Sequence, residues 1–160
     1  MKNLNLNLQY ASAFKPLPSE SQIRQYMELA LSKESFSKDT ALELTLRFVD
    51  IEEIRALNFN FRQKDKATNV LSFPFEMPVG LVLPQRILGD IVICPEILLQ
   101  EAAEQDKPYE NHFAHMVIHG VLHLLGYDHD NEVEADVMES LEIELLNILN
   151  IRNPYQSLEN

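Results

Sequence analysis

Two segments of the chain place an apolar residue at every second position. Residues 4–8 alternate leucine with asparagine, and residues 42–48 alternate apolar with polar side chains. Because successive side chains of a strand point to opposite faces, both patterns predict half-buried strands. Two more strands are predicted over 69–73 and 87–93, and the nearly continuous apolar character of the last is typical of a central strand.

Helix-start signals fall between these strands. Ser19 and Gln22 can form a capping box that begins a helix lasting to about residue 32. Asp50 and Glu53 are predicted to begin a second helix in the same way, lasting to about residue 60. Three further helices are predicted over 95–105, 109–125 and 131–149.

The resulting order of elements, βαβαββααα, predicts an α+β fold. We expect a small mixed β-sheet covered by helices, in a single domain spanning residues 1–160. Between the third and fourth strands, residues 74–84 contain proline and glycine and are predicted to form an exposed flap.

Three histidines at the end of the fourth predicted helix have the spacing of metal ligands. His119 and His123 lie four residues apart, which brings their rings to one face of a helix. His129 lies six residues further on, a helical rise of roughly 9 Å, so the chain has to turn before it. Gly126 permits that turn because glycine readily adopts the left-handed conformation that ends helices. Three nitrogens leave one position open on tetrahedral Zn²⁺, as in catalytic sites, and we predict one zinc ion per chain.

Gly120 separates this motif from the zinc peptidases that share its spacing. A metal-binding helix followed by a glycine turn resembles the metzincin-like core, but those enzymes carry a glutamate general base directly after the first histidine. Here that position holds Gly120. Peptide hydrolysis is therefore the weaker hypothesis.

Three neighbouring residues keep more than one interpretation. His115 precedes His119 by four residues, yet only the pair of His119 and His123 has a glycine turn and a third imidazole downstream. We therefore interpret His115 as interior-facing or as lying behind the ligands, and His112 as an ordinary helix histidine. Asp128 can orient a ligand imidazole, act on water at the metal, or cap the next helix.

Composition restricts the setting of the protein. The 160 residues suffice for a core without disulfides, and Cys94 is the only cysteine, which fits a reducing cytoplasm. The N-terminal residues lack the apolar core of a signal peptide, and no apolar run is long enough to span a bilayer. We expect a cytoplasmic protein with no membrane partner.

The formal net charge of −12 opposes binding to nucleic acid, but the charges are unevenly distributed. Residues 130–144 contain seven carboxylates and no basic residue, on a predicted surface helix. Residues 55–66 contain four basic side chains against Asp65 alone. The second segment is either a local basic patch or a solvated loop.

Three blocks of sequence carry a family resemblance. They are Arg62–Pro74, Gly89–Ile93 and His119–His129. In order and spacing they resemble the signature blocks of the YbeY family of bacterial rRNA-maturation endoribonucleases. One departure is Asn69, where many members have aspartate, although asparagine keeps a turn or hydrogen-bonding role.

The resemblance implies a zinc-dependent endoribonuclease that prefers single-stranded RNA. It implies a function in 16S rRNA 3′-end maturation, rRNA processing and 70S ribosome quality control. The implied partners are single-stranded RNA, precursor 16S rRNA, the ribosome and ribosomal proteins, and not DNA. By position, the resemblance implies three metal ligands, which are His119, His123 and His129. It also implies two catalytic residues: His119, and Arg62, which matches the functionally important arginine of the family.

The chemistry of these residues agrees with that function. Bound Zn²⁺ can lower the pKa of its water to about 7 or polarise a phosphoryl oxygen. The planar guanidinium of Arg62 suits the oxygens of a phosphodiester, and its alternative role is a surface salt bridge. Two other hypotheses stay open: a zinc metallopeptidase-like hydrolase, and a non-catalytic ribosome-binding factor with a structural metal, whose acidic surface contacts basic ribosomal proteins.

Overall fold

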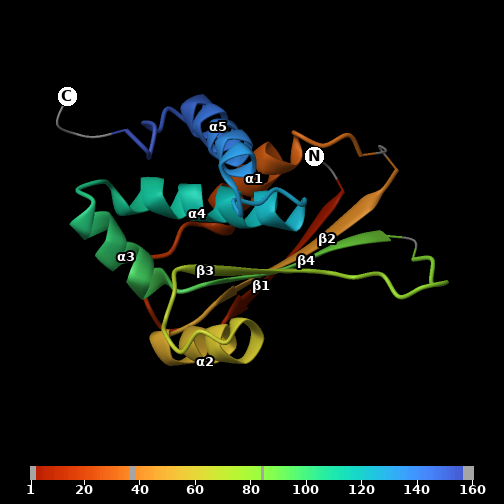
Figure 1. Cartoon of the computed structure of the whole chain (residues 1–160), viewed down its shortest axis with the longest axis horizontal. Helices are drawn as coiled ribbons and strands as arrows, with labels where there is room; N and C mark the ends of the chain where they lie inside the picture. Colours follow the sequence, from red (N-terminus) through yellow and green to blue (C-terminus); the bar gives the residue numbers. More distant parts are fainter. Residues whose placement is uncertain (1–2, 37–38, 84, 157–160) are drawn as a thin grey trace.

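The predicted order of elements is confirmed in a computed structural model, which describes residues 3–36, 39–83 and 85–156 (Figure 1). The elements are β1 (Leu4–Tyr10), α1 (Glu20–Leu31), β2 (Ala41–Phe48), α2 (Ile51–Arg62), β3 (Val70–Pro74), β4 (Gln85–Ile93), α3 (Pro95–Glu104), α4 (Tyr109–Leu124) and α5 (Glu132–Ile148). The chain is therefore of the mixed α+β class.

The four strands form one sheet in the order β1-β2-β4-β3. β1, β2 and β4 run parallel, and β3 runs antiparallel to β4. The mixed sheet and the interior position of β4 both match the sequence prediction. Parallel neighbours need a crossover, and α1 supplies the one between β1 and β2.

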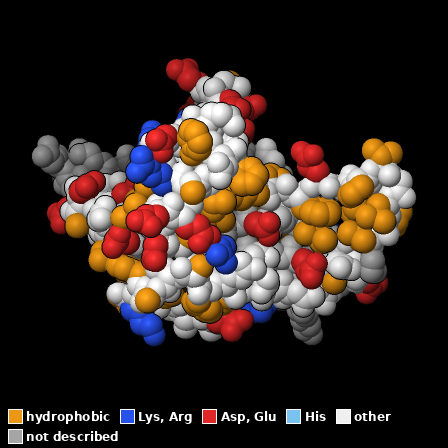
Figure 2. Space-filling model, turned by 90° about the horizontal axis from the view of Figure 1, so that it is seen from below, with side chains coloured by type: hydrophobic (Ala, Val, Ile, Leu, Met, Phe, Trp, Pro, Cys, Tyr) orange, Lys and Arg blue, Asp and Glu red, His pale blue; other side chains and the backbone are white. Residues whose placement is uncertain are grey.

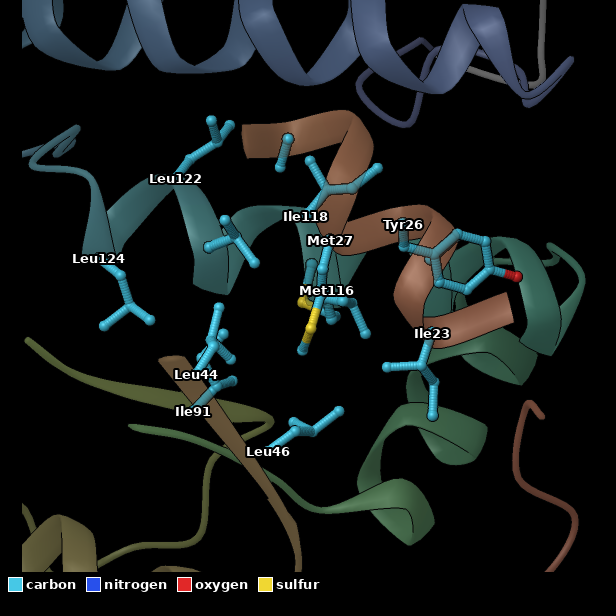
Figure 3. Packing of buried hydrophobic residues seen from close by; sticks show 14 of the residues in the cluster. Ile23, Tyr26, Met27, Leu44, Leu46, Ile91, Met116, Ile118, Leu122 and Leu124 are labelled. Atoms are coloured by element: carbon cyan, nitrogen blue, oxygen red, sulfur yellow. The ribbon is translucent and has the colours of Figure 1, made fainter. Parts of the chain in front are cut away.

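Helices cover both faces of the sheet (Figure 1). α1 and α4 lie on one face with α5 outside them, and α2 lies on the other. Figure 3 shows apolar side chains of α1 and α4 meeting those of β2 and β4. The alternation in β2 is confirmed, since Leu42, Leu44, Leu46 and Phe48 are each 2% exposed or less. Burial of each such side chain stabilises the fold by roughly 1.5–3 kcal/mol.

Two glycines let α4 approach the sheet closely. A Cβ added to Gly120 of α4 would lie 3.0 Å from Cγ2 of Ile91 in β4. A Cβ added to Gly89 would lie 2.3 Å from the carbonyl oxygen of Phe73 and 2.9 Å from Leu124. Gly89 also has a φ of +140° at a register irregularity between β2 and β4. Both positions therefore fix the distance between the metal-site helix and the strands beneath it.

The predicted helix starts are correct at α1 and wrong in part at α2. Ser19 and Gln22 form the reciprocal capping box at the start of α1. Asp50 occupies the N-cap position of α2 but makes no capping hydrogen bond; its carboxylate accepts from the hydroxyl of Ser12 instead. Glu53 is likewise engaged elsewhere, by the guanidinium of Arg47. A nearby cation and a nearby hydroxyl thus displaced the local capping bonds.

The prediction that α5 is a surface helix is also wrong in part. Most of its carboxylates are exposed, but Met138, Glu142, Leu145 and Leu146 are buried. These four residues lie on one helical stripe, which α5 packs against the core. Glu142 is fully buried within that stripe.

The predicted flap between β3 and β4 is exposed over residues 74–82, and Leu83 is partly buried. Pro84, the last residue of the predicted flap, lies outside the described residues. Figure 2 shows apolar side chains gathered on this projecting end of the molecule. The exposed apolar residues there are Phe75, Met77, Val79, Leu81 and Val82. Among the described residues, no helix combines the length and apolar character needed to cross a membrane.

Candidate metal centre

α4 ends in a tight turn that returns the chain toward the helix. Gly126 has a φ of +102°, and its N–H donates to the carbonyl of His123 at 3.0 Å. The next N–H, of Tyr127, donates to the carbonyl of Leu122 at 3.0 Å. These two bonds form a Schellman motif with glycine at the left-handed position. The turn carries the chain back so that His129 lies beside the last two histidines of α4.

The three histidines predicted as ligands lie together. Nε2 of His119 and Nε2 of His123 are 3.0 Å apart. The ring centroid of His129 lies 5.7 Å from that of His119 and 5.0 Å from that of His123. One nitrogen from each ring falls within 4.8 Å of the others. Two nitrogens on one tetrahedral zinc are about 3.3 Å apart, so small side-chain adjustments suffice for this group to hold a metal.

The electrostatic setting of His123 favours the neutral imidazole, which a metal requires. Burial, together with the proximity of His119 and His129, lowers the pKa of His123 to about 4. His123 is therefore neutral near pH 7 and offers a lone pair. The exposed fraction of the side chain is 18% for His119 and 54% for His129, so the group opens to solvent on the His129 side.

A buried carboxylate lies directly behind His119. Nδ1 of His119 donates to Oε2 of Glu142 at 2.9 Å. Because an ionised carboxylate only accepts, the proton lies on Nδ1, and Nε2 keeps its lone pair toward His123. Burial by itself would raise the pKa of Glu142, but hydrogen bonds from His115 and His119 outweigh it and lower that pKa below its usual range. Glu142 is thus ionised although buried.

Sequence reasoning missed Glu142, although a signal was present. The carboxylate occupies the apolar stripe of α5, between Met138 and Leu145. A charged residue inside such a stripe has to find a buried partner, because an unpaired buried charge is strongly unfavourable. The histidines of α4 are that partner.

The inner histidines of α4 are bound to carboxylates from other helices. His115 donates from Nε2 to Oε2 of Glu142 at 2.8 Å, and His112 from Nε2 to Oε1 of Glu101 at 2.9 Å. The interpretation of His115 as interior-facing is confirmed, since it is 5% exposed. His115, His119 and Glu142 form a second group whose geometry could hold a metal. His119 belongs to both groups, with one ring nitrogen directed to each.

Arg62 and the three histidines line the same hollow, which has a volume of about 470 Å³. Its lining comes from the end of α2, from β3 and the two residues before it, from the last two turns of α4 and from the turn after α4. The remaining lining residues are Thr68, Asn69, Val70, Ser72, Pro74, Gly126, Tyr127 and Asp128. The fold therefore brings two of the three sequence blocks, Arg62–Pro74 and His119–His129, to one cavity.

Arg62 is exposed at the last position of α2. Within the described part of the chain its guanidinium makes no ion pair or hydrogen bond, whereas that of Arg55 pairs with Asp65 at 2.9 Å. Lys64 and Lys66 are also exposed in the loop that follows. Within this basic segment, Arg62 therefore lines the hollow with an uncompensated positive charge, and two further exposed lysines follow it along the chain.

Asn69 has a hydrogen-bonding role. Its Nδ2 donates to both carboxylate oxygens of Glu101, at 3.1 and 3.3 Å, and its Oδ1 accepts from the N–H of Val70. An aspartate could not donate to Glu101 and would repel it. Asparagine at position 69, where many family members have aspartate, is therefore compatible with the neighbouring carboxylate of Glu101, which accepts its hydrogen bonds.

Asp128 does not cap α5. That role belongs to Asn131, whose side chain accepts from the N–H of Glu134. Asp128 accepts instead from the N–H of His129 at 2.7 Å, which lowers the pKa of its carboxyl. The same carboxylate lies 3.5 Å from Nδ1 of His129. The capping alternative is therefore wrong, and Asp128 lies where it can orient His129.

Comparison with known proteins assigns the family. A family model described as Endoribonuclease YbeY matches residues 7–150. The chain belongs to the YbeY family. It is 49% identical over 150 residues to the Endoribonuclease YbeY of Colwellia psychrerythraea, a match that covers 94% of this chain and 96% of that protein. The YbeY match includes all three signature blocks.

The fold has a counterpart among solved structures. The solution structure of TM1509 from Thermotoga maritima is similar to this chain with a TM-score of 0.55 and 24% sequence identity. The similarity covers 98% of this chain and 99% of that one. It supports the fold assignment over almost the whole length.

Proposed function

We propose that this chain is a zinc-dependent endoribonuclease that cleaves single-stranded RNA. The observation that carries the proposal is the meeting of three imidazole nitrogens and an unpaired arginine in one hollow. The membership of the YbeY family supports the choice of RNA as substrate. We assign the activity to one domain spanning residues 1–160, with a metzincin-like arrangement of metal helix and glycine turn.

The donor set fits zinc. Neutral imidazole is a preferred ligand of Zn²⁺, and three histidines with an open fourth position are the usual composition of a catalytic site. His119, His123 and His129 are the proposed ligands. Bound there, zinc supplies a Lewis acid that polarises a phosphoryl oxygen or makes water more acidic.

The protein residues have separate tasks around that centre. Arg62 binds the non-bridging oxygens of the scissile phosphate and stabilises charge that develops on them. Lys64 and Lys66 attract the RNA backbone to the rim of the hollow, which offsets the overall negative charge. Asp128 orients His129 through Nδ1 of its ring, which lies 3.5 Å from the carboxylate.

The environment of Gly120 disfavours a peptidase. Gly120 faces Ile91 at a distance where even a Cβ would crowd that side chain. A glutamate at this position would have to displace the helix from the sheet. The site therefore lacks the general base of the zinc peptidases for a packing reason.

The proposed biological setting is ribosome maturation in the cytoplasm. Precursor 16S rRNA is the proposed substrate, with functions in 3′-end maturation, rRNA processing and 70S ribosome quality control. The acidic face of α5 offers a surface for basic ribosomal proteins.

A cleavage assay tests the substrate class. Purified protein is incubated with an unstructured RNA that spans the 3′ end of precursor 16S rRNA, and in parallel with casein. We expect RNA cleavage that chelator abolishes and added zinc restores, with casein intact. Metal-dependent proteolysis without RNA cleavage would reverse the assignment. Unfolding on chelation, with no cleavage of either substrate, would favour a ribosome-binding factor with a structural metal.

Arg62→Lys tests the proposed role of the arginine. The variant keeps the positive charge but loses the bidentate guanidinium, so we expect kcat to fall by about tenfold or more while RNA affinity changes little. Arg55→Lys is the matched control, because Arg55 lies on the same helix and is paired with Asp65. An Arg62→Lys enzyme with wild-type kcat would reduce this residue to a surface cation.

A further inference from the structure

The buried carboxylate of Glu142 is the centre of a hydrogen-bond network that reaches from the C-terminal segment to His119. Its Oε2 accepts from His115 at 2.8 Å and from His119 at 2.9 Å. Its Oε1 accepts from the hydroxyl of Tyr155 at 2.6 Å. Three elements therefore converge on one side chain: α4, α5 and the segment after α5.

We propose that Glu142 is a positioning residue for the metal centre, and that Tyr155 and His115 hold Glu142 in place for this task. The carboxylate keeps the proton of His119 on Nδ1 and so directs the Nε2 lone pair to the metal. It also raises the basicity of that nitrogen. This inference rests on the proposed metal site but not on the proposed RNA substrate.

The geometry distinguishes positioning from metal binding by Glu142 itself. The carboxylate is 0% exposed and already accepts three hydrogen bonds, so a cation would have to displace protons from satisfied donors in a closed space. Nε2 of His119, in contrast, faces His123 across 3.0 Å and lines the open hollow. The outer group is therefore the metal site, and the inner group supports it.

Tyr155 extends the network to the surface. The residue is 47% exposed, and its ring packs edge-on against His115 with centroids 5.6 Å apart, while its hydroxyl donates to the buried carboxylate. The aromatic ring thus covers the network from the side of the C-terminal segment. Loss of this one hydroxyl leaves Glu142 with its two imidazole donors only.

Zinc affinity of the whole protein, measured by competition with a chromophoric chelator, tests the proposal. Groups behind metal ligands contribute roughly 10- to 100-fold in affinity. We expect Glu142→Gln, which keeps the shape and one acceptor, to weaken zinc binding about tenfold, and Glu142→Leu to approach a hundredfold loss. Tyr155→Phe should weaken it roughly fivefold, the value of one hydrogen bond.

Matched controls separate this effect from general changes of charge or packing. Asp136→Asn removes one negative charge from the exposed face of the same helix, and Tyr10→Phe removes a hydroxyl from an exposed aromatic ring. Both should bind zinc as the wild type does. Circular dichroism of each apo variant checks that it is folded.

A spectroscopic measurement reads the positioning directly. Two-bond ¹H–¹⁵N spectra of the imidazoles report which ring nitrogen carries the proton. We expect His119 to be protonated on Nδ1 in the wild type and Glu142→Gln, and to become a mixture of tautomers in Glu142→Leu. This readout needs neither RNA nor catalysis.

The outcomes that overturn the inference are distinct from those that overturn the proposed function. Wild-type zinc affinity in folded Glu142→Gln and Tyr155→Phe would overturn it. Zinc binding that is lost in Glu142→Gln but kept in His123→Ala would place the metal in the inner group and also overturn it. If zinc affinity follows our expectation while the wild type cleaves no RNA, the positioning role stands and the proposed substrate falls.

Discussion

The four histidines of α4 divide into two pairs with different surroundings, although they share one helix. The inner pair, His112 and His115, is nearly inaccessible, and each ring donates to a glutamate from another helix. The outer pair, His119 and His123, turns its Nε2 atoms toward each other in an open hollow, where His129 joins them.

This difference shows what makes a histidine a ligand candidate. Helical spacing places all four rings on one side of α4, but it determines only the direction in which each ring points and not the group that the ring contacts. The partner that another element delivers decides the rest. α3 and α5 deliver carboxylates to the inner pair, and the turn at Gly126 delivers a third imidazole to the outer pair. His119 stands between them and takes one partner from each.

Removal of an outer imidazole should have the largest effect. We expect His119→Ala, His123→Ala and His129→Ala each to weaken zinc binding by more than roughly 100-fold, beyond the loss for a group behind a ligand. His112→Ala should leave zinc content unchanged, since its ring donates to Glu101 and lies outside the group of three histidines. Metal analysis after dialysis measures both. Full zinc retention in His129→Ala would remove that residue from the ligand set.

For the free energy of unfolding we expect the opposite order: loss of an inner histidine should destabilise the protein more than loss of an outer one. In the apo protein, His115→Ala removes a donor from the buried carboxylate of Glu142, and we expect a loss of about 3 kcal/mol in the free energy of unfolding. His129→Ala, at a half-exposed ring, should cost less than about 0.5 kcal/mol. Urea unfolding in the presence of chelator measures both values. Equal losses in the two variants would contradict the division into inner and outer histidines.

Lowering the pH should reduce the free energy of unfolding of the apo protein through both the inner and the outer histidines. Burial lowers the pKa of His115 from 6.5, and burial with neighbouring imidazoles lowers that of His123 to about 4. Below pH 6.5 the unfolded chain therefore binds protons that the folded chain does not, and the free energy of unfolding falls as the pH drops. The lowered pKa of Glu142 adds a further loss below its ordinary value of 4.5.

The contribution of the outer set to this pH dependence can be isolated. Urea unfolding between pH 7 and pH 4 should give a shallower slope for His123→Ala than for the wild type. Identical slopes would show that His123 titrates normally in the folded protein.

The turn that joins His129 to the outer pair can be tested by a substitution at Gly126. Gly126→Ala meets no atom within 4 Å, so its cost is only that of a left-handed alanine, about 1 kcal/mol. Gly80→Ala, in the exposed flap at a φ of +83°, should cost about the same and is the control. Zinc affinity should fall in Gly126→Ala only. Unchanged zinc affinity would mean that His129 reaches the metal without this turn.

The sequence by itself determined the elements and the proposed ligands. The period of two in residues 4–8 and 42–48, the capping box at Ser19 and the order of nine elements all rest on local geometry, which short-range sequence encodes. The spacing of His119, His123 and His129 is equally local, because one helix and one turn contain it.

Tertiary structure alone decided the partners. Arg62 reaches the hollow because α2 ends beside the start of β3, and Glu142 reaches His119 because α5 packs its apolar stripe onto α4. Long-range contacts of this kind follow from how faces pack and not from spacing along the chain. The same reason explains the failure at Asp50, where the hydroxyl of Ser12, 38 residues earlier, replaced a local cap. A local sequence pattern determines the direction in which a side chain points, and the packing of the elements determines which side chain from elsewhere in the chain contacts it.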